Sequence, residues 1–485
     1  MRKVKVRTLY LIAIIVGGLV GLATKSTYAM FTASAEIDNP ICMSANLTSE
    51  EETIETMEVV VTAGEKKIVP VTINNTSTNT VGYSVWYTSP SDEVEIGIKL
   101  SNSDSSNSTG TISSNGSKKV YVQIINNSAS SVTITLGVIS NKTSNDMTLI
   151  PNTELDFSVN LVTYIKNLYT NATKTTTTVN SVTYNLAPSE GLMNDRKGSM
   201  STGIDAGNIR YYGANPNNYI YFNCSDYSNQ SSDTCETWRI IGVFDGKVKI
   251  MRGSVIGSYS WDSSADSINS GYGVNEWSQA DLMKLLNGGY ETETVGGSLY
   301  WNAKSGTCYN DSKNATTACN FTSTGLKNDT TRNMIAETTY YTRGHNDNSI
   351  YVDAMYDKER VSGTVITGVT PTRTLTWTGK IAIPYPSDYG YAADLSLCQQ
   401  QLSSYSDATC TANNWMKEIV TPNYGWLLTP SSGSADSAWG VYSSGDVYRY
   451  NAYNAFGVAP VLSMTSELGI VAGTGTDSDP YQLYV

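Results

Sequence analysis

The first part of the chain alternates hydrophobic and polar positions with a period of two. Runs such as KIVPVTI, VGYSVWY, KKVYVQI and SVTITLGVI place every second side chain on one face, which is typical of half-buried strands. These runs lie between about residues 30 and 165, where we predict an Ig-like or jelly-roll β-sandwich. Because no cluster of titratable side chains accompanies them, we expect this domain to be a structural stalk.

Two strand-turn-strand segments of this region resemble each other. VPVTINNTSTNTVGYSVWY begins at Val69, and VYVQIINNSASSVTITLGV begins at Val120. Each passes through an Asn-Asn-Thr or Asn-Asn-Ser turn between two apolar runs. This pattern predicts a β-hairpin in both places.

The pattern changes after residue 165. Residues 166–200 are rich in Thr and poor in apolar side chains, which predicts a linker followed by the first strands of a second domain. Residues 201–485 combine many short strand-like runs with a few helical ones. This mixture favours an α+β domain over a parallel βαβ repeat, so the whole chain is expected to be mainly β or α+β.

The clearest helix of the second domain is predicted in NEWSQADLMKLLNGGY, residues 275–290. Ser278 and Asp281, three residues apart, resemble a capping box at its start, and Gly288 provides a stop signal. One apolar face is made by three leucines, Leu282, Leu285 and Leu286.

The N-terminus has the pattern of an export signal. Four basic residues precede the uncharged run LYLIAIIVGGLVGLA, residues 9–23, which is shorter than the roughly 20 residues that span a bilayer. Residues 1–29 are therefore predicted to be a signal peptide cleaved after Ala29, with an uncleaved membrane anchor as the alternative. Either form places the rest of the chain outside the cytoplasm. TYAMFTASAEI also resembles the TYAxFT junction of Gram-positive surface and matrix proteins that are exported with a dedicated signal peptidase.

Composition and charge narrow the class of partner. Ser, Thr, Asn, Gly and Tyr dominate, and the 485 residues carry a net charge of −12. Outside the N-terminus there is no basic run, so nucleic acid is excluded as a partner.

Six of the seven cysteines form close sequential pairs: Cys224/Cys235, Cys308/Cys319 and Cys398/Cys410. The stretches between them are polar and rich in turn residues, and no cysteine or histidine has the short spacing of a metal site. We predict three local disulfides, which are typical of an exported protein. Cys42 remains, either as an inert thiol or as one half of an intermolecular disulfide.

Several motifs resemble a family of uncharacterised surface proteins from Gram-positive gut bacteria. They are NYIYFNCSDYSNQSSDTCETWRIIGVF, NEWSQADLMKLLN, TWTGKIAIPYPSDYGYA, GWLLTPSSGSADSAWGVYSSGDVYRYNAYNAFGVAPVLSM and GTGTDSDPYQL, which together span most of residues 170–485. The resemblance implies a C-type-lectin-like fold, shared with formylglycine-generating enzymes, for residues 201–485. The reactive cysteines of those enzymes have no equivalent here, so their activity is not implied.

Catalytic and metal-binding residues are sparse. The single histidine, His345, lies in TRGHNDNS without a nucleophile elbow. The carboxylates considered for glycoside hydrolysis are scattered along the chain: Glu236, Glu276, Asp388 and Glu418. Asp477 and Asp479 lie in a glycine-rich loop that lacks the ligand pattern of a calcium loop, and a capped turn is the expected structure. We therefore expect no catalytic residue, no metal and no cofactor.

The segment SAWGVYSSGDVYRYNAYNAFGVAPVL, residues 437–462, carries the candidate binding site. We predict a hairpin in which Trp439 and Val441 belong to the core. Aromatic rings and amides are adaptable contacts for sugar rings and protein surfaces. The candidate ligand-binding residues are Tyr442, Tyr448, Arg449, Tyr450, Asn451, Tyr453 and Asn454.

Together these patterns predict an exported, adhesin-like protein at the cell surface. Its C-terminal domain is expected to recognise a surface glycan or protein of a host or neighbouring cell without a metal ion. Two alternatives stay open: a structural component of a surface fibre or biofilm matrix, and a secreted carbohydrate-active enzyme. If residues 1–29 are an uncleaved membrane anchor, the protein would be attached to the membrane through its N-terminus.

Overall fold

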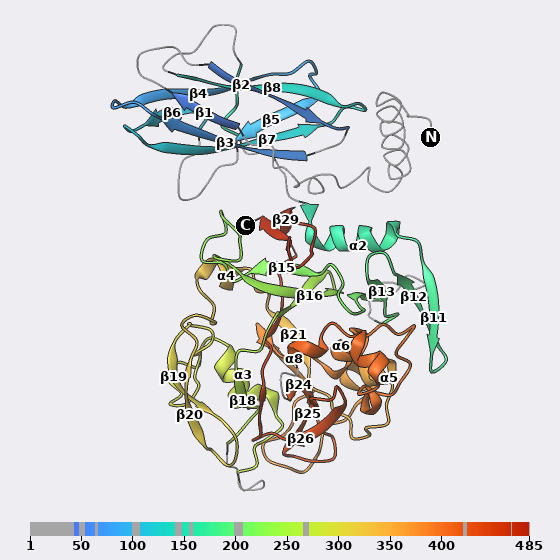
Figure 1. Ribbon diagram of the computed structural model, residues 1–485. Helices are drawn as coiled ribbons and strands as arrows, with labels where there is room; N and C mark the ends of the chain where they lie inside the picture. The colour runs from blue at the N-terminus through green and yellow to red at the C-terminus, as the bar shows by residue number, and fades with distance from the viewer. Residues whose placement is uncertain are drawn as a thin grey trace, which may run out of the picture. The chain divides into compact units, whose positions relative to one another are not determined.

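The computed structural model is mainly β, with several separate sheets and short helices, as predicted (Figure 1). It describes residues 43–47, 54–63, 66–98, 107–140, 148–153, 155, 159–197, 207–264, 271–420, 424–466 and 468–484. The predicted signal segment, its cleavage site and Cys42 lie outside these residues. The chain divides into two compact units, Met1–Phe157 and Ser158–Val485.

The first unit is a sandwich of two sheets. One sheet has the order β1 (Met43–Leu47), β3 (Lys66–Asn75), β7 (Ser117–Asn126) and β5 (Val94–Ile98). The other has the order β2 (Ile54–Val61), β8 (Val132–Ser140), β4 (Val81–Thr88) and β6 (Thr109–Ile112), and β9 (Thr148–Leu149) pairs with β4. Alternate side chains of both sheets fill one apolar core, which includes Val71, Ile73, Val122 and Leu136.

The two similar segments of this unit are not hairpins, and that prediction is wrong. Strand β3 lies in one sheet and β4 in the other, and the same holds for β7 and β8. Each Asn-Asn turn therefore carries the chain across the core from one sheet to its partner. The side chains of Asn75 and Asn126 bond the turn backbone in the same way, and these contacts replace the ladder bonds of a hairpin.

The second unit begins before the segment that we expected as a linker. Asn160 accepts a hydrogen bond from the Thr163 backbone (3.1 Å) and starts helix α2 (Leu161–Asn171), whose buried face includes Ile165 and Tyr169. The Thr-rich stretch after it pairs as β11 (Thr175–Val179) and β12 (Val182–Ala187), so residues 166–197 are part of the second unit.

The largest sheet of the second unit begins with β11 and β12 (Figure 1). Its strand order continues from β11 and β12 to β13 (Leu192–Asn194), β14 (Ile209–Tyr211), β16 (Glu236–Phe244), β17 (Lys247–Arg252), β28 (Val461–Ser463) and β23 (Ile381–Ala382), with β15 (Tyr219–Phe222) paired to β16.

A second sheet carries the candidate binding hairpin. Its order is β18 (Ser258–Ser260), β27 (Ala455–Gly457), β24 (Gly425–Pro430), β25 (Ser437–Val441) and β26 (Val447–Asn451). The smaller pairings are β10 (Val159–Asn160) with β29 (Gly469–Ala472) and β30 (Gln482–Tyr484), β19 (Ser305–Tyr309) with β20 (Thr316–Asn320), and β21 (Thr338–Tyr341) with β22 (Thr376–Gly379).

The helices of this unit are short. They are η1 (Trp277–Gln279), α3 (Asp281–Leu286), α4 (Asp329–Asn333), α5 (Val352–Asp357), η2 (Lys358–Ser362), α6 (Pro386–Tyr391), η3 (Leu402–Ser404), α7 (Ala408–Ala412) and α8 (Lys417–Val420). Their apolar faces and the sheets enclose a core that contains Met355, Tyr389, Leu402 and Trp439.

The predicted helix in residues 275–290 is shorter than expected, and its capping box is absent. Ser278 lies in η1 and donates to Glu276 (2.7 Å), and α3 has no side-chain cap. Asp281 instead lies in the first turn of α3, where its side chain accepts hydrogen bonds from Ser263 and Ser264 in the loop after β18. The helix ends at Leu286, before Gly288, because the Asn287 side chain bonds the backbone of Ile381. Its three leucines are buried, as predicted.

Candidate functional site

The hairpin of residues 437–451 forms as predicted. Strands β25 and β26 pair antiparallel with Trp439 opposite Arg449 and Val441 opposite Val447. Trp439 and Val441 are fully buried, which confirms that they belong to the core. The turn between the strands closes through a hydrogen bond from the Tyr442 backbone N–H to the Asp446 carbonyl (2.7 Å).

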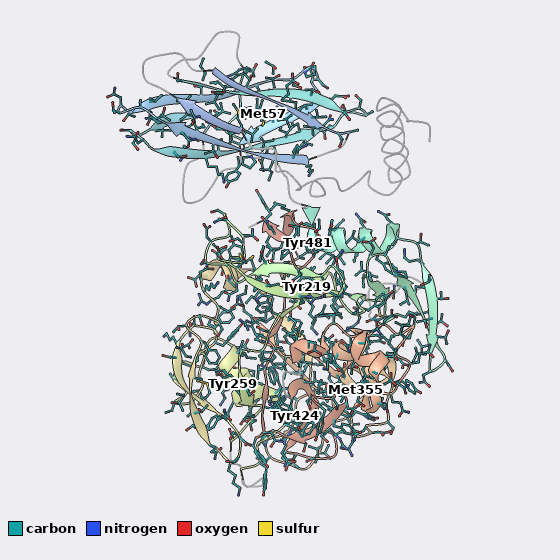
Figure 2. The ribbon with its side chains drawn as sticks, in the orientation of Figure 1. Met57, Tyr219, Tyr259, Met355, Tyr424 and Tyr481 are labelled. Atoms are coloured by element: carbon teal, nitrogen blue, oxygen red, sulfur yellow. A yellow bond between two sulfur atoms is a disulfide. The ribbon has the colours of Figure 1, made fainter. Side chains whose placement is uncertain are left out.

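Aromatic rings from three strands and two loops meet on one side of this hairpin. We call them the hairpin aromatic cluster: Tyr424, Trp426, Tyr442, Tyr450 and Phe456. The Tyr424 ring stacks on Phe456, with centroids 4.9 Å apart, and meets the edge of Tyr442 at 4.7 Å. Tyr450 packs edge-on against Phe456 at 4.9 Å. Figure 2 shows Tyr424 at the end of the unit that carries β25 and β26.

A glycine makes room for this cluster. A side chain at Gly440 would meet the Tyr450 ring at 3.3 Å and the Phe456 ring at 3.5 Å, so both rings lie directly against the β25 backbone. The cluster then presents its outer rings to solvent, because Tyr442 is 38% exposed and Tyr424 is half-buried. A hydrogen bond with Tyr442 raises the pKa of Tyr424, and the two rings also pack edge to face.

Tyr450 is half-buried and contacts three rings of the cluster, those of Tyr424, Tyr442 and Phe456. Its hydroxyl is buried without a hydrogen-bond partner in the described structure, and burial raises the pKa of this tyrosine. A buried hydroxyl without a partner costs folding free energy. Because the polar end of Tyr450 is buried, we expect the ligand to contact the Tyr442 and Tyr424 rings.

Tyr448 and Arg449 point to opposite sides of β26. Tyr448 lies on the same side as Tyr450, and its hydroxyl reaches the Ser403 carbonyl at 3.4 Å. Arg449 lies over the Trp439 ring at 5.8 Å and donates to the Asn348 side chain (3.3 Å). Burial lowers the pKa of Arg449. Arg449 is thus directed at the loop around Asn348, on the face opposite the cluster.

The last three predicted residues follow the hairpin into the next loop. Asn451 accepts a hydrogen bond from Ser437 (3.3 Å), and the Asn454 backbone N–H donates to the Asn451 carbonyl (3.0 Å). The Tyr453 ring packs near Tyr272, with centroids 5.6 Å apart. Of the seven predicted residues, Tyr442 and Tyr450 join the cluster, and the other five have contacts elsewhere.

Sequence reasoning missed Tyr424 and Phe456. Tyr424 directly precedes β24, and Trp426 lies in that strand two residues later. This spacing places both rings on one face. That signal was present in the sequence. The pairing of β24 with β25, which brings this face beside the hairpin, depends on long-range contacts that the local pattern does not contain.

The carboxylates considered for hydrolysis have separate partners. Asp388 accepts from Arg210 (3.0 Å) and from Lys249, and Arg210 also pairs with Asp195 (2.5 Å). All four side chains are buried. Burial alone would raise the pKa of Asp388, but Lys249 and Arg210 hold it well below its usual range. These side chains form a buried ion-pair network that joins the largest sheet of the second unit to α6.

The other three carboxylates lie apart from this network. Glu236 pairs with Arg252 (3.0 Å), and Glu418 is exposed beside Lys417 (2.7 Å). Glu276 is buried and accepts hydrogen bonds from the Thr374 backbone and hydroxyl. The contacts of Glu236 and Glu276 link separate segments of the fold.

The remaining candidates have structural contacts. His345 uses its carbonyl to accept from the Trp439 indole (3.2 Å), and burial lowers its pKa. Asp479 accepts from the backbone and hydroxyl of Thr474 (both 2.9 Å), which is the expected capped turn, while Asp477 is exposed. No group of three or more His, Cys, Asp or Glu side chains that could hold a metal ion occurs among the residues that the structure describes.

The three predicted disulfides are confirmed: Cys224–Cys235, Cys308–Cys319 and Cys398–Cys410. Disulfides persist in oxidising compartments, so they are consistent with a protein that functions outside the cytosol. Within the described ranges, no helix has both the length and the apolar character that crossing a membrane requires.

Comparison with known proteins gives little further information. No family model and no curated protein matches the sequence. Among solved structures, the chain is similar to PliG of Aeromonas hydrophila, a periplasmic inhibitor of g-type lysozyme. That match has 10% sequence identity and a TM-score of 0.13, and it covers 21% of this chain and 99% of PliG. A TM-score this low does not establish a shared fold.

Proposed function

We propose that the protein is exported to the cell surface and binds a glycan or protein ligand, without a metal ion, through the hairpin aromatic cluster. The observation that carries this proposal is that Tyr442 is 38% exposed, with the half-buried Tyr424 ring beside it, and that both rings pack against Tyr450. Rings held in this way lose little conformational freedom on binding, which is why tyrosine is common in recognition surfaces.

The composition around the rings supports the same proposal. Ser443 and Ser444 in the turn are exposed, and hydroxyls of this kind donate and accept hydrogen bonds beside an aromatic platform. Such a surface fits a sugar ring or an exposed side chain of a protein. The disulfides support the exported location, and the export signal in residues 1–29 stays a prediction.

The test is binding of the purified full-length protein to glycan and protein arrays. Tyr442→Ala should weaken binding by about tenfold or more, since a well-placed aromatic contact at an interface contributes about 2 kcal/mol. Tyr341→Ala is the matched control, because Tyr341 has the same 38% exposure but lies outside the cluster. Equal binding by both variants would contradict the proposal. Self-association without array binding would instead favour the surface-fibre alternative.

A further inference from the structure

A polar pocket opens at the other end of the second unit, away from the hairpin. Its volume is about 380 Å³, and it lies between β15, β16, the end of β17, α8 and the C-terminal loop. Figure 2 shows Tyr219, which lines this pocket, far from Tyr424 of the hairpin aromatic cluster. Pockets of this size accept a ligand as small as a monosaccharide or an amino acid.

Two arginines line the pocket, and their surroundings differ. Arg252 is neutralised by Glu236, with Nε–Oε2 and Nη2–Oε1 distances of 3.0 and 3.3 Å, and its Nη1 donates to Ser254 (2.8 Å). Arg239 forms no ion pair with any residue that the structure describes. Only one of the two positive charges is therefore balanced by the fold.

The Arg239 guanidinium is held rigidly from behind. Its Nε donates to Asn218 (2.5 Å), and its Nη2 donates to Asn215 (3.3 Å). The Tyr219 ring lies 3.6 Å from its central carbon, and the Trp415 ring lies on it at 5.0 Å. In the described part of the chain its Nη1 makes no hydrogen bond, so this donor group remains available to the pocket that Arg239 lines.

A buried cation without a counter-ion is costly for a fold. Arg239 is 6% exposed, and burial lowers its pKa to about 10, so it remains charged at neutral pH. Asp477 is the acidic side chain that acts on the pKa of Arg239, but it is an exposed residue of the pocket rim and no ion pair joins the two in the described structure. A fixed arginine that lines a cavity and keeps one guanidinium nitrogen without a partner is a usual arrangement for binding an oxyanion.

We propose that this pocket binds the carboxylate of a small acidic ligand, with Arg239 Nη1 as the principal donor. A carboxylate fits better than a phosphate because only one positive charge is unbalanced. Glu236 and Asp477 would repel a dianion more strongly than a monoanion. Thr237 also lines the pocket and is a candidate for hydrogen bonds to the rest of the ligand. This site is independent of the hairpin aromatic cluster.

Calorimetric titration of the full-length protein tests the proposal with two matched pairs of probes. Glucuronate is compared with glucose, and alanine with alaninamide, so that each pair differs in its carboxylate and the two pairs separate a sugar acid from an amino acid. At least one carboxylate should bind about tenfold or more tightly than its neutral partner, the range of a charge-assisted hydrogen bond. Equal affinity within both pairs, or no binding by either carboxylate, would overturn the proposal.

Three variants locate the site. Arg239→Lys keeps the charge but loses the planar guanidinium, so carboxylate affinity should fall about tenfold. Arg196→Gln is the control. It removes an exposed arginine outside the pocket and should bind like wild type. Asp477→Asn changes an exposed rim residue and should strengthen carboxylate binding, because it removes a repelling charge. If Arg239→Lys does not fold, the Asp477→Asn result still decides: unchanged or weaker binding would refute the assignment.

Discussion

Replacement of Asn126 by Ala should destabilise the first unit strongly. The side chain is fully buried, and its Nδ2 donates to the carbonyls of Val61 (2.9 Å), Thr62 (3.0 Å) and Ser130 (2.9 Å). Its Oδ1 accepts from the backbone and the hydroxyl of Ser128 (3.0 and 2.6 Å). One amide thus fixes the crossing from β7 to β8 and ties it to the end of β2.

The magnitude follows from these contacts. Alanine removes all of them and leaves buried carbonyl and N–H groups without partners, each of which costs about 1 kcal/mol or more. We expect a loss of about 3 kcal/mol in the free energy of unfolding of the first unit. Asn127→Ala is the control, because the neighbouring Asn127 is exposed and donates to Glu95 at the surface, so its loss should stay within about 0.5 kcal/mol.

Hydrogen exchange followed by mass spectrometry measures this in the full-length protein, since it reports on each unit separately. A loss of 3 kcal/mol raises the exchange rate of the β7 and β8 amides by roughly 100-fold where exchange follows unfolding of the unit. Peptides of the second unit should exchange as in wild type. If Asn126→Ala and Asn127→Ala gave the same exchange in β7 and β8, the proposed role of the buried amide would be wrong.

Three further predictions concern the second unit. Burial and the neighbouring Asp281 raise the pKa of Asp262 well above its usual value. The folded state therefore binds this proton more tightly than the unfolded state does. The resulting contribution of Asp262 to stability is full below the unfolded pKa near 3.9 and is lost as pH rises through the folded pKa. Asp281→Asn should reduce that loss. The measurement is the unfolding midpoint of wild type and Asp281→Asn across pH, and a difference between the two that does not change with pH would contradict this reasoning. Tyr450→Phe removes a buried hydroxyl without a partner and should leave urea stability unchanged or raise it by up to about 1 kcal/mol; a clear loss would reveal a missing hydrogen bond. The Cys308→Ala/Cys319→Ala pair should lower stability by about 2–3 kcal/mol, and a change below 1 kcal/mol in urea unfolding would contradict the loop-closure argument.

The local features of the fold could be predicted from the sequence. Strand alternation identified β3, β4, β7 and β8, and cysteine spacing identified the three disulfides, because both signals depend on residues close together in the chain. The burial of Trp439 followed from the same alternation. The route from β3 to β4 could not be predicted this way, since a hairpin and a crossing between sheets have the same local pattern of strand, Asn-rich turn and strand.

The candidate sites show the same limit. Tyr442 was recognised because the hairpin is local, whereas its ring partner Tyr424 directly precedes β24, a strand whose pairing is set by the tertiary fold. Arg239 gave no signal at all. Its significance comes from the absence of an ion pair to it in the described structure. Of the two acidic residues on the pocket, Glu236 pairs with Arg252, and Asp477 is more than 200 positions away in the sequence.

The abundance of tyrosine does not by itself identify a binding surface. Tyr184, Tyr211, Tyr300 and Tyr391 are fully or almost fully buried, so these rings act as core residues. In the hairpin aromatic cluster the Tyr450 hydroxyl is buried as well, whereas the Tyr442 ring is 38% exposed. A recognition role therefore depends on which rings reach solvent while being held by other rings, and Tyr442 meets both conditions. This is why Tyr442→Ala, compared with the equally exposed Tyr341→Ala, distinguishes a binding surface from an ordinary exposed tyrosine.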